Sequence, residues 1–255
     1  MAVPFLLLIT SDDSDQGVKI QWMESNKYGA FTTCKLYEQR VLEALLKNDN
    51  LRSVVITQFP YSKDLASGSV ILDPFGLLLR DWVVDKGGKL VYIDNEQDPN
   101  AMKVLNESFF GGDAQWKHAE PVSGYYRLSR SGQDVLMVND ADNDNDNLVK
   151  YNFGRSTRNI KVKDYHDALV EPRPIPVGQL FAELPPDLEE PAFMKVVKEY
   201  DEHADDCFRQ KKNTPFAMHQ LTGGGSVVFI GFEPGTDEDK ATVRAVVTGQ
   251  PLNEA

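Results

Sequence analysis

The sequence predicts an α/β protein, and residues 75–96 carry the main evidence for this fold class. Phe75, Leu79 and Trp82 recur at helical spacing and share one face of a predicted helix. Two glycines then end the helix, because glycine readily adopts the left-handed conformation needed there. Residues 90–93 follow as an unbroken apolar run, which is typical of a strand covered on both faces. Helix, glycine stop and buried strand together form one unit of an α/β sheet.

Apolar runs before this unit predict two more buried strands. Residues 5–10 read FLLLIT, and residues 53–59 read SVVITQF, with the β-branched side chains that strands favour. A short strand is expected at residues 18–22. A helix is expected at residues 33–47, where apolar side chains share one helical face. These side chains are Cys34, Tyr37, Val41, Leu42 and Leu45.

The middle of the chain predicts one helix, two strands and two irregular segments. The helix covers residues 98–110, and the strands cover residues 134–138 and 148–153. Residues 109–128 are rich in glycine and aromatic side chains, so we expect an irregular lid or hairpin there. Residues 139–147 form an acidic loop.

Proline and glycine organise the last third of the chain. Residues 170–191 are rich in proline and predict a surface connection without a long regular element. Pro191 suits the first turn of a long helix. Two apolar runs, residues 215–221 and 226–233, are joined by glycines and predict a late β-hairpin. Thr236 then begins a capping box for the last helix.

Length and charge exclude several classes of protein. At 255 residues the chain is long enough for one large α/β domain, and we expect a single domain over residues 1–255 because repeats and a clear linker are absent. The net charge of −12 argues against nucleic acid or an anionic membrane as partner, because phosphate groups would be repelled. We expect a small molecule or a protein as partner. A homodimer is compatible with this fold class.

The two cysteines and the N-terminal residues indicate an intracellular protein. Cys34 and Cys207 lie far apart in different predicted helices, so neither a disulfide scaffold nor a CxxC zinc site is expected. The first residues lack the basic segment of a signal peptide. No stretch reaches the ~20 apolar residues of a membrane-spanning helix. We therefore expect a soluble, cytoplasmic protein.

Polar side chains follow the predicted strands at the edge where open α/β sheets bind ligands. They are Asp12, Asp13, Gln58, Tyr61, Asp94 and Glu96. Clustered carboxylates supply a general acid and base, or bind a divalent cation. The alternative is that these side chains cap helices or face solvent. We take Asp94 and Glu96 as catalytic candidates and the other four as candidates for ligand binding.

Two of the four histidines are candidate site residues. His118 lies in the aromatic segment close to Trp116, and it is our third catalytic candidate. Trp116 and His219, which ends a predicted strand, are further candidates for ligand binding. No HxH, HxxxH or HExxH spacing occurs, so no metal site is expected. The alternative for each histidine is a surface position or a structural role.

The acidic loop and the glycines do not form a known ion or nucleotide motif. An EF-hand loop requires glycine at its sixth position and glutamate at its twelfth. Counting from Asp140 these are Asn145 and Tyr151, so the loop is expected to be a solvated hairpin loop. GxxxxGK[ST], a strand-linked GxGxxG and GxSxG are all absent, and we expect no cofactor.

Two stretches resemble one known superfamily. LLRDWVVDKGGKLVYI, residues 78–93, resembles the helix–glycine–strand unit of class I glutamine amidotransferase-like domains. FAMHQLTGGGSVVFIGFEP, residues 216–234, resembles the late strand pair of the trehalose-utilisation (ThuA-like) branch and of the related gliding-motility and intraflagellar-transport domains. The resemblance spans residues 53–247 and implies a flavodoxin-like, doubly wound, mainly parallel sheet with helices on both faces.

The same resemblance shows which catalytic residues this chain lacks. An amidotransferase has a G-x-C-x-G elbow that exposes and activates a cysteine. Here the strand after Gly88 ends in Asp94 and contains no cysteine, and His219 is followed by Gln220 and not by a His-x-Glu pair. The ThuA-like branch often has a histidine at the position of Asp94. Glutaminase activity is therefore not expected.

Two functional hypotheses follow from these residues. The first is a catalytically degenerate amidotransferase-like domain that acts as a small-molecule-binding or protein-interaction module. The second is an enzyme that acts on a small polar substrate, such as a sugar derivative, through carboxylates at the carboxyl edge of the sheet. In the second hypothesis Asp94 or Glu96 works together with His118. Convergence of these carboxylates on a pocket with a histidine in hydrogen-bond reach would favour the enzyme.

Overall fold

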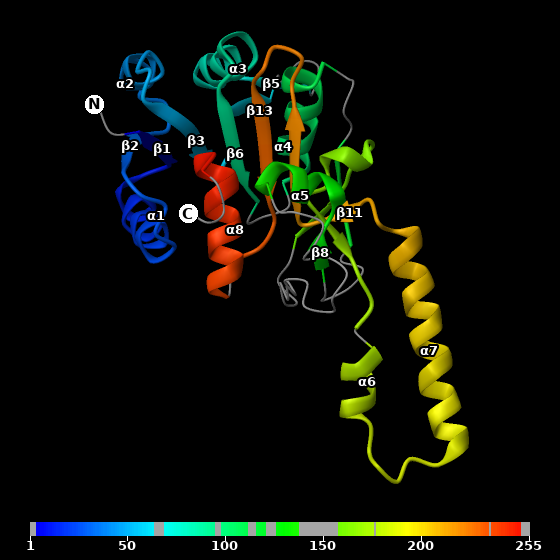
Figure 1. Cartoon of the computed structure of the whole chain (residues 1–255). Helices are drawn as coiled ribbons and strands as arrows, with labels where there is room; N and C mark the ends of the chain where they lie inside the picture. Colours follow the sequence, from blue (N-terminus) through cyan, green and yellow to red (C-terminus); the bar gives the residue numbers. More distant parts are fainter. Residues whose placement is uncertain are drawn as a thin grey trace.

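Among the residues that the computed structural model describes, six strands form the central sheet, in the spatial order β12-β13-β6-β3-β1-β2 (Figure 1). Their bounds are β1 Phe5–Thr10, β2 Phe31–Lys35, β3 Leu51–Ile56, β6 Lys89–Ile93, β12 Phe216–Gln220 and β13 Ser226–Ile230. The edge strand β12 is antiparallel to its neighbour, and the other pairs are parallel. The described residues are 4–63, 69–94, 98–111, 116–120, 126–137, 158–175, 177–234 and 236–250. The sheet confirms the predicted flavodoxin-like α/β fold.

Helices cover both faces of this sheet because alternate side chains of each strand point to opposite faces. In β6, Leu90 and Tyr92 belong to one hydrophobic cluster, whereas Val91 and Ile93 belong to another. The helices that pack on the first cluster are α2 Gln39–Leu45, α3 Pro74–Lys86 and α4 Pro99–Val104. Those on the second are α1 Asp13–Ser25, α5 Arg130–Leu136 and α8 Asp237–Thr248. The strands are thus buried on both sides, as their unbroken apolar runs predict.

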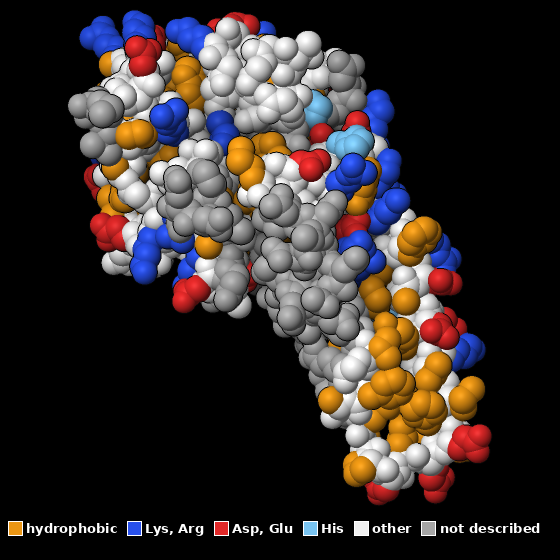
Figure 2. Space-filling view, in the orientation of Figure 1, with side chains coloured by type: hydrophobic (Ala, Val, Ile, Leu, Met, Phe, Trp, Pro, Cys, Tyr) orange, Lys and Arg blue, Asp and Glu red, His pale blue; other side chains and the backbone are white. Residues whose placement is uncertain are grey.

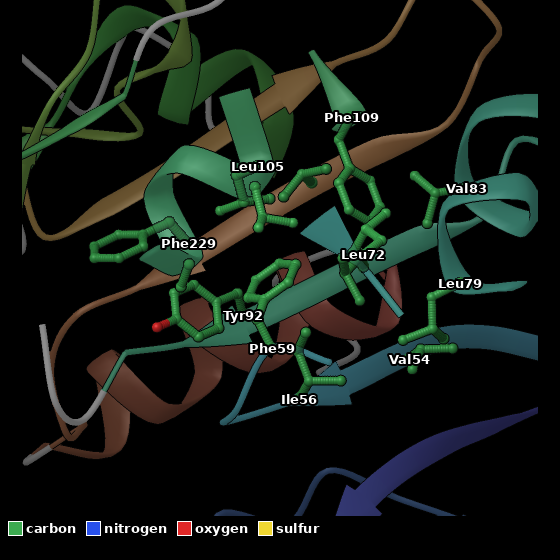
Figure 3. Close-up of a cluster of buried hydrophobic side chains, with 14 of the residues drawn as sticks. Val54, Ile56, Phe59, Leu72, Leu79, Val83, Tyr92, Leu105, Phe109 and Phe229 are labelled. Atoms are coloured by element: carbon green, nitrogen blue, oxygen red, sulfur yellow. The ribbon is translucent and has the colours of Figure 1, made fainter. Parts of the chain in front are cut away.

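An aromatic cluster fixes the carboxyl ends of the central strands against the first layer of helices (Figure 3). Tyr92 of β6 packs edge-on against Phe59, with ring centroids 4.9 Å apart. Phe59 also contacts Phe109 at 6.0 Å, and Tyr92 lies 6.2 Å from Phe229 of β13. All four rings are buried, and burying each contributes about 1.5–3 kcal/mol. This packing holds the last residues of β6 in place.

Several predicted elements of the second half are confirmed. The glycine-joined hairpin is β12 and β13. The helix at residues 98–110 is α4, which continues into a π-helical turn, η1 Leu105–Phe109. Pro191 lies in the first turn of α7, Glu190–Arg209. Thr236 and Asp239 form the capping box of α8.

The helix predicted at residues 33–47 is wrong in its first part. Residues up to Lys35 belong to β2, which pairs with β1, and α2 begins only at Gln39. Thr32 and Thr33 favour a strand because they are β-branched. Tyr37 then reverses the chain with a φ of 73°. The apparent helical stripe therefore combined residues of a strand with residues of a helix.

Two strand predictions are also wrong. Residues 18–22 lie inside α1, in which Met23 is the buried residue. The helix was missed because its sequence has no apolar stripe at helical spacing. Residues 134–138 lie mostly in α5, whose start is capped by the Ser129 hydroxyl accepting from the amide of Gly132. A run of a few apolar residues does not distinguish a strand from a short helix.

Several short elements lie outside the central sheet. They are β4 Tyr61–Lys63, β5 Val70–Leu72, β7 Lys117–Ala119, β8 Tyr126–Leu128, β9 Asn159–Lys161, η3 Tyr165–Asp167, β10 Val170–Pro172 and β11 Asn213–Thr214. Strand β9 pairs with both β7 and β11, and β8 pairs with β10. The acidic loop at 139–147 and the strand predicted at 148–153 lie outside the described residues.

Helices α6, Val177–Glu183, and α7 form an arm that projects from the body of the protein (Figure 1). Hydrophobic side chains gather on this arm (Figure 2). Phe181 stacks on Phe193 with ring centroids 5.9 Å apart, while Met194 and Phe208 are 58% and 75% exposed. The described residues of the proline-rich segment 170–191 form only short elements before α7, as predicted, but the expected surface connection is wrong at its start, because β10 is buried. In the described part of the chain, no helix combines the length and apolarity needed to span a membrane. A single domain over the whole chain stays a prediction.

Candidate functional site

Asp94 is the first residue after β6, at the carboxyl edge of the sheet. Its amide donates to the carbonyl of Ile230 at 2.9 Å, so the parallel pairing with β13 fixes its backbone. The residue is only 2% exposed, and its Oδ1 accepts a hydrogen bond from the Tyr92 hydroxyl at 3.2 Å. A buried carboxylate is costly unless donors surround it, so this position requires hydrogen-bond partners.

His118 supplies one of these partners. Its Nε2 lies 2.8 Å from Oδ2 of Asp94, and its side chain is 19% exposed. The histidine sits in β7 and pairs with Ile160 of β9, which places it beside the end of β6. A carboxylate accepts hydrogen bonds, so the proton of a neutral imidazole resides on Nε2 and the Nδ1 lone pair is available. The fold thus brings together two of the three predicted catalytic residues.

His118 also lines a hollow of about 520 Å³ on the side of α4 and η1. The other lining residues are Pro99, Met102, Lys103, Asn106, Glu107, Trp116 and Lys117. Asn106 fixes the start of β7, because its side chain bonds both the amide and the carbonyl of Trp116 at 2.8 Å. His118 therefore both bonds the buried Asp94 and lines this hollow.

Trp116 and His219 meet at a second buried carboxylate, Asp167. The indole Nε1 of Trp116 donates to Oδ2 of Asp167 at 2.8 Å, and Nδ1 of His219 lies 2.9 Å from its Oδ1. The His219 ring packs edge-on against Phe110, with centroids 4.7 Å apart. Asp167 was missed by the sequence analysis, because it belongs to a polar stretch with no periodicity or motif. Trp116 and His219 are thus brought together, but in a packed network.

A second cavity, of about 400 Å³, opens at the carboxyl edge next to Asp94. It is lined by Leu8, Asp15, Val18, Lys19, Trp22, Thr57, Ile93, Asp94, Arg158, Gly231, Phe232 and Glu233. Lys19, Trp22 and Arg158 were not predicted. Lys19 and Trp22 were assigned to the wrong element, and Arg158 has no neighbouring motif. The sequence does contain a signal for the position of Lys19. Lys19 follows Asp15 by four residues, which is the spacing of an i,i+4 ion pair on a helix.

The two aspartates predicted after β1 do not converge on this cavity. Asp12 caps α1, and hydrogen bonds from the Asp15 amide and the Ser14 hydroxyl lower the pKa of Asp12. Asp13 is exposed and pairs with Lys35 at 2.6 Å. Asp15 lines the cavity instead. Burial alone would raise the pKa of Asp15, but its bonds to Lys19 and Ser11 hold it below the usual value.

The remaining candidates are Gln58, Tyr61 and Glu96. Gln58 is exposed after β3. Tyr61, in β4, accepts a hydrogen bond from the Asn100 side chain at 3.3 Å. Glu96 lies outside the described residues.

Neither the cysteines nor a metal cluster offers another site in the described residues. Cys34 is buried, and its burial together with Glu38 raises the pKa of the thiol to about 11, which keeps it protonated. Cys207 is also buried, with its Sγ 3.6 Å from Nε2 of His203. Among the described side chains, no group of three or more His, Cys, Asp or Glu could hold a metal ion.

Comparison with known proteins does not assign a family. No family model matches the sequence, and no curated protein is significantly similar to it. One similar solved structure is that of Agd3, described as a novel carbohydrate deacetylase, with a TM-score of 0.48 and 9% identity. The similarity covers 98% of this chain but only 32% of the Agd3 chain. At this distance it does not assign an activity.

Proposed function

We propose that the protein is an enzyme that acts on a small polar substrate by general-base catalysis at Asp94 and His118. The observation that carries this proposal is the 2.8 Å hydrogen bond between Nε2 of His118 and the buried Asp94 carboxylate, at the carboxyl edge of the sheet. Open α/β sheets bind their ligands at this edge. A histidine oriented by a buried carboxylate is a common general base.

In this proposal the free Nδ1 of His118 takes a proton from a water molecule or a substrate hydroxyl. Within the described residues, Nδ1 has no hydrogen-bond partner that would compete for its lone pair. Asp94 keeps the required tautomer and stabilises the imidazolium that forms. The Tyr92 hydroxyl holds the other carboxylate oxygen, so the pair keeps its orientation. The substrate would occupy the hollow that His118 lines together with Lys103 and Glu107.

Membership of the amidotransferase-like superfamily stays part of the proposal. The helix–glycine–strand unit and the late hairpin that suggested it are both formed. The chain nevertheless has Asp94 where the superfamily places its nucleophile or a histidine. We therefore propose chemistry that uses His118 as base and involves no cysteine nucleophile.

A panel of nitrophenyl esters and nitrophenyl glycosides tests the proposal. We expect one class to be turned over above the buffer rate, and His118→Asn to lower kcat by about 100-fold or more, which is the usual contribution of a general base. A matched control is His166→Asn, which changes an exposed histidine outside the pair. Failure of every compound, or full activity in His118→Asn, would contradict the proposal.

The projecting arm favours a second function, that of a protein-interaction module. Exposed hydrophobic residues such as Met194 and Phe208 lie on α7, where exposed acidic side chains outnumber basic ones. Glu199 and Glu202 pair with Lys195 and Lys198, and Glu190 and Asp201 are exposed acids beyond these two pairs. This combination suits a partner helix with an apolar face and basic edges. It is independent of the Asp94–His118 pair.

A fluorescent amphipathic helical peptide with lysine edges tests this second function. We expect binding that weakens at least ~10-fold in the double variant Met194→Ser, Phe208→Ser, because the apolar anchors are lost. A peptide of the same apolar face with glutamate edges is the control. Equal binding of both peptides would contradict the proposed acidic rim.

A further inference from the structure

Arg158 lines the wall of the 400 Å³ cavity, and none of the described carboxylates pairs with its charge. Its backbone amide donates to the carbonyl of Gly231 at 2.5 Å, which fixes the residue at the end of β13. Its Nε is buried and has no hydrogen-bond partner, and no described carboxylate forms an ion pair with its guanidinium. Buried polar groups almost always have partners. The Arg158 guanidinium beside the cavity therefore has a donor available for a ligand.

The chain brings Arg158 to this position through a glycine. A Cβ atom on Gly231 would lie 1.9 Å from the carbonyl oxygen of Arg158, which is far inside any tolerated contact. Residue 231 must therefore be glycine for this approach to occur. The close approach places the arginine beside Asp94, whose amide bonds to Ile230, the residue before Gly231.

The other charges around the cavity are already engaged or lie at its rim. Lys19 is neutralised by Asp15 at 2.6 Å. Asp94 accepts hydrogen bonds from His118 and Tyr92. Glu233 is exposed at the rim. Among the described lining residues, Arg158 is the cation left without an anion.

We infer that this cavity binds a small polyhydroxy carboxylate, such as a sugar acid, and that Arg158 anchors its carboxylate. A planar guanidinium matches a carboxylate with two parallel hydrogen bonds. Trp22 and Phe232 provide apolar walls, and Thr57 and Glu233 provide partners for hydroxyl groups. A volume of about 400 Å³ lies within the range of small-molecule sites. This inference goes beyond the proposed function, since His118 does not line this cavity.

Calorimetric titration with gluconate and glucose tests the inference, because the two probes share hydroxyl groups and differ in the carboxylate. We expect gluconate to bind the wild-type protein at least ~10-fold more tightly than glucose, since charge-assisted bonds are the strong ones. Arg158→Gln should weaken gluconate binding by about 10-fold or more. Arg158→Lys, which keeps the charge but loses the planar fork, should give an intermediate affinity.

Two further variants make the result decisive. Arg80→Gln, which changes an exposed arginine of α3, should leave gluconate binding unchanged. Glu233→Gln should tighten it about two- to threefold by removing a like charge at the rim. Arg158→Gln keeps the hydrogen bond between His118 and Asp94, so its nitrophenyl turnover reports on the general-base proposal and its gluconate affinity reports on this inference, which makes the two failures separable. No gluconate binding, equal binding of glucose, preference for inorganic phosphate, or full binding in Arg158→Gln would overturn the inference.

Discussion

Among the described residues, two histidines each pair with a buried aspartate, and the two pairs are alike in distance and differ in setting. His118 lies 2.8 Å from Asp94, and His219 lies 2.9 Å from Asp167. Their side chains are 19% and 20% exposed. Distance and exposure therefore do not distinguish a chemical pair from a structural one.

The position of each pair in the sheet does distinguish them. Asp94 ends a central parallel strand, at the edge where ligands bind. His219 lies in the antiparallel edge strand β12 opposite Val227, the second residue of β13, and so near the amino end of that neighbour. Its carboxylate is also held by Trp116, and its ring is packed against Phe110. We take the first pair as chemical and the second as a structural link between β7, η3 and β12.

Removal of Asp167 should have the largest effect on stability. Asp167→Ala leaves the buried Nε1 of Trp116 and the Nδ1 of His219 without their acceptor, and each unsatisfied group costs about 1–3 kcal/mol. We expect the free energy of unfolding to fall by about 3 kcal/mol, measured by urea denaturation. Trp116→Phe, which removes one donor, should cost about half as much. A loss below about 1 kcal/mol in Asp167→Ala would show that this pair does not hold the fold.

Lys89 should produce a smaller, pH-dependent effect at the opposite edge of the sheet. Its Nζ donates to the carbonyl of Val246 near the end of α8, and burial lowers the pKa of Lys89 to about 8. Between this value and the unfolded pKa of about 10.4, the unfolded chain binds more protons than the folded protein, so stability rises with pH. Relative to a variant without Lys89, we expect a gain of roughly 1–3 kcal/mol between pH 8 and pH 10. The raised pKa of Cys34 opposes this gain equally in both proteins.

Lys89→Met is the matched variant for this measurement, because it keeps the length of the side chain and removes the titration. Thermal unfolding of both proteins between pH 7 and pH 10 should show the rise in the wild type alone. The same rise in Lys89→Met would assign it to another group. The contribution of Lys89 must be subtracted from the measured stability before any pH dependence is attributed to the two histidine pairs.

The sequence predicts well the helix and strand that carry the site, but it predicts the residues of the site only in part. Buried strands and glycine stops are local signals, so residues 75–93 predict α3, β6 and the location of Asp94. Asp94 and His118 are 24 positions apart, and the pairing of β7 with β9 positions His118 for their contact. No local sequence pattern predicts that strand pairing. His118 was selected for its aromatic neighbours, one of which, Trp116, serves the other pair.

The residues that were missed share a physical reason. Asp167 and Arg158 acquire their roles from contacts with Trp116 and Gly231, which lie 51 and 73 positions away in the chain. Asp12 and Asp13 were predicted because they follow a strand, yet Asp12 caps α1. Strand ends indicate where a site lies, but helix capping competes for the same polar residues.

One paired measurement tests the central claim most directly. The turnover of the nitrophenyl panel and the free energy of unfolding are determined for His118→Asn and for His219→Asn. We expect His118→Asn to lose about 100-fold or more in kcat and His219→Asn to keep its kcat, while each variant loses about 1–3 kcal/mol of stability because each removes a hydrogen bond to a buried aspartate. Retained turnover in His118→Asn, or the same loss of turnover in both variants, would contradict the assignment of Asp94 and His118 as the chemical pair.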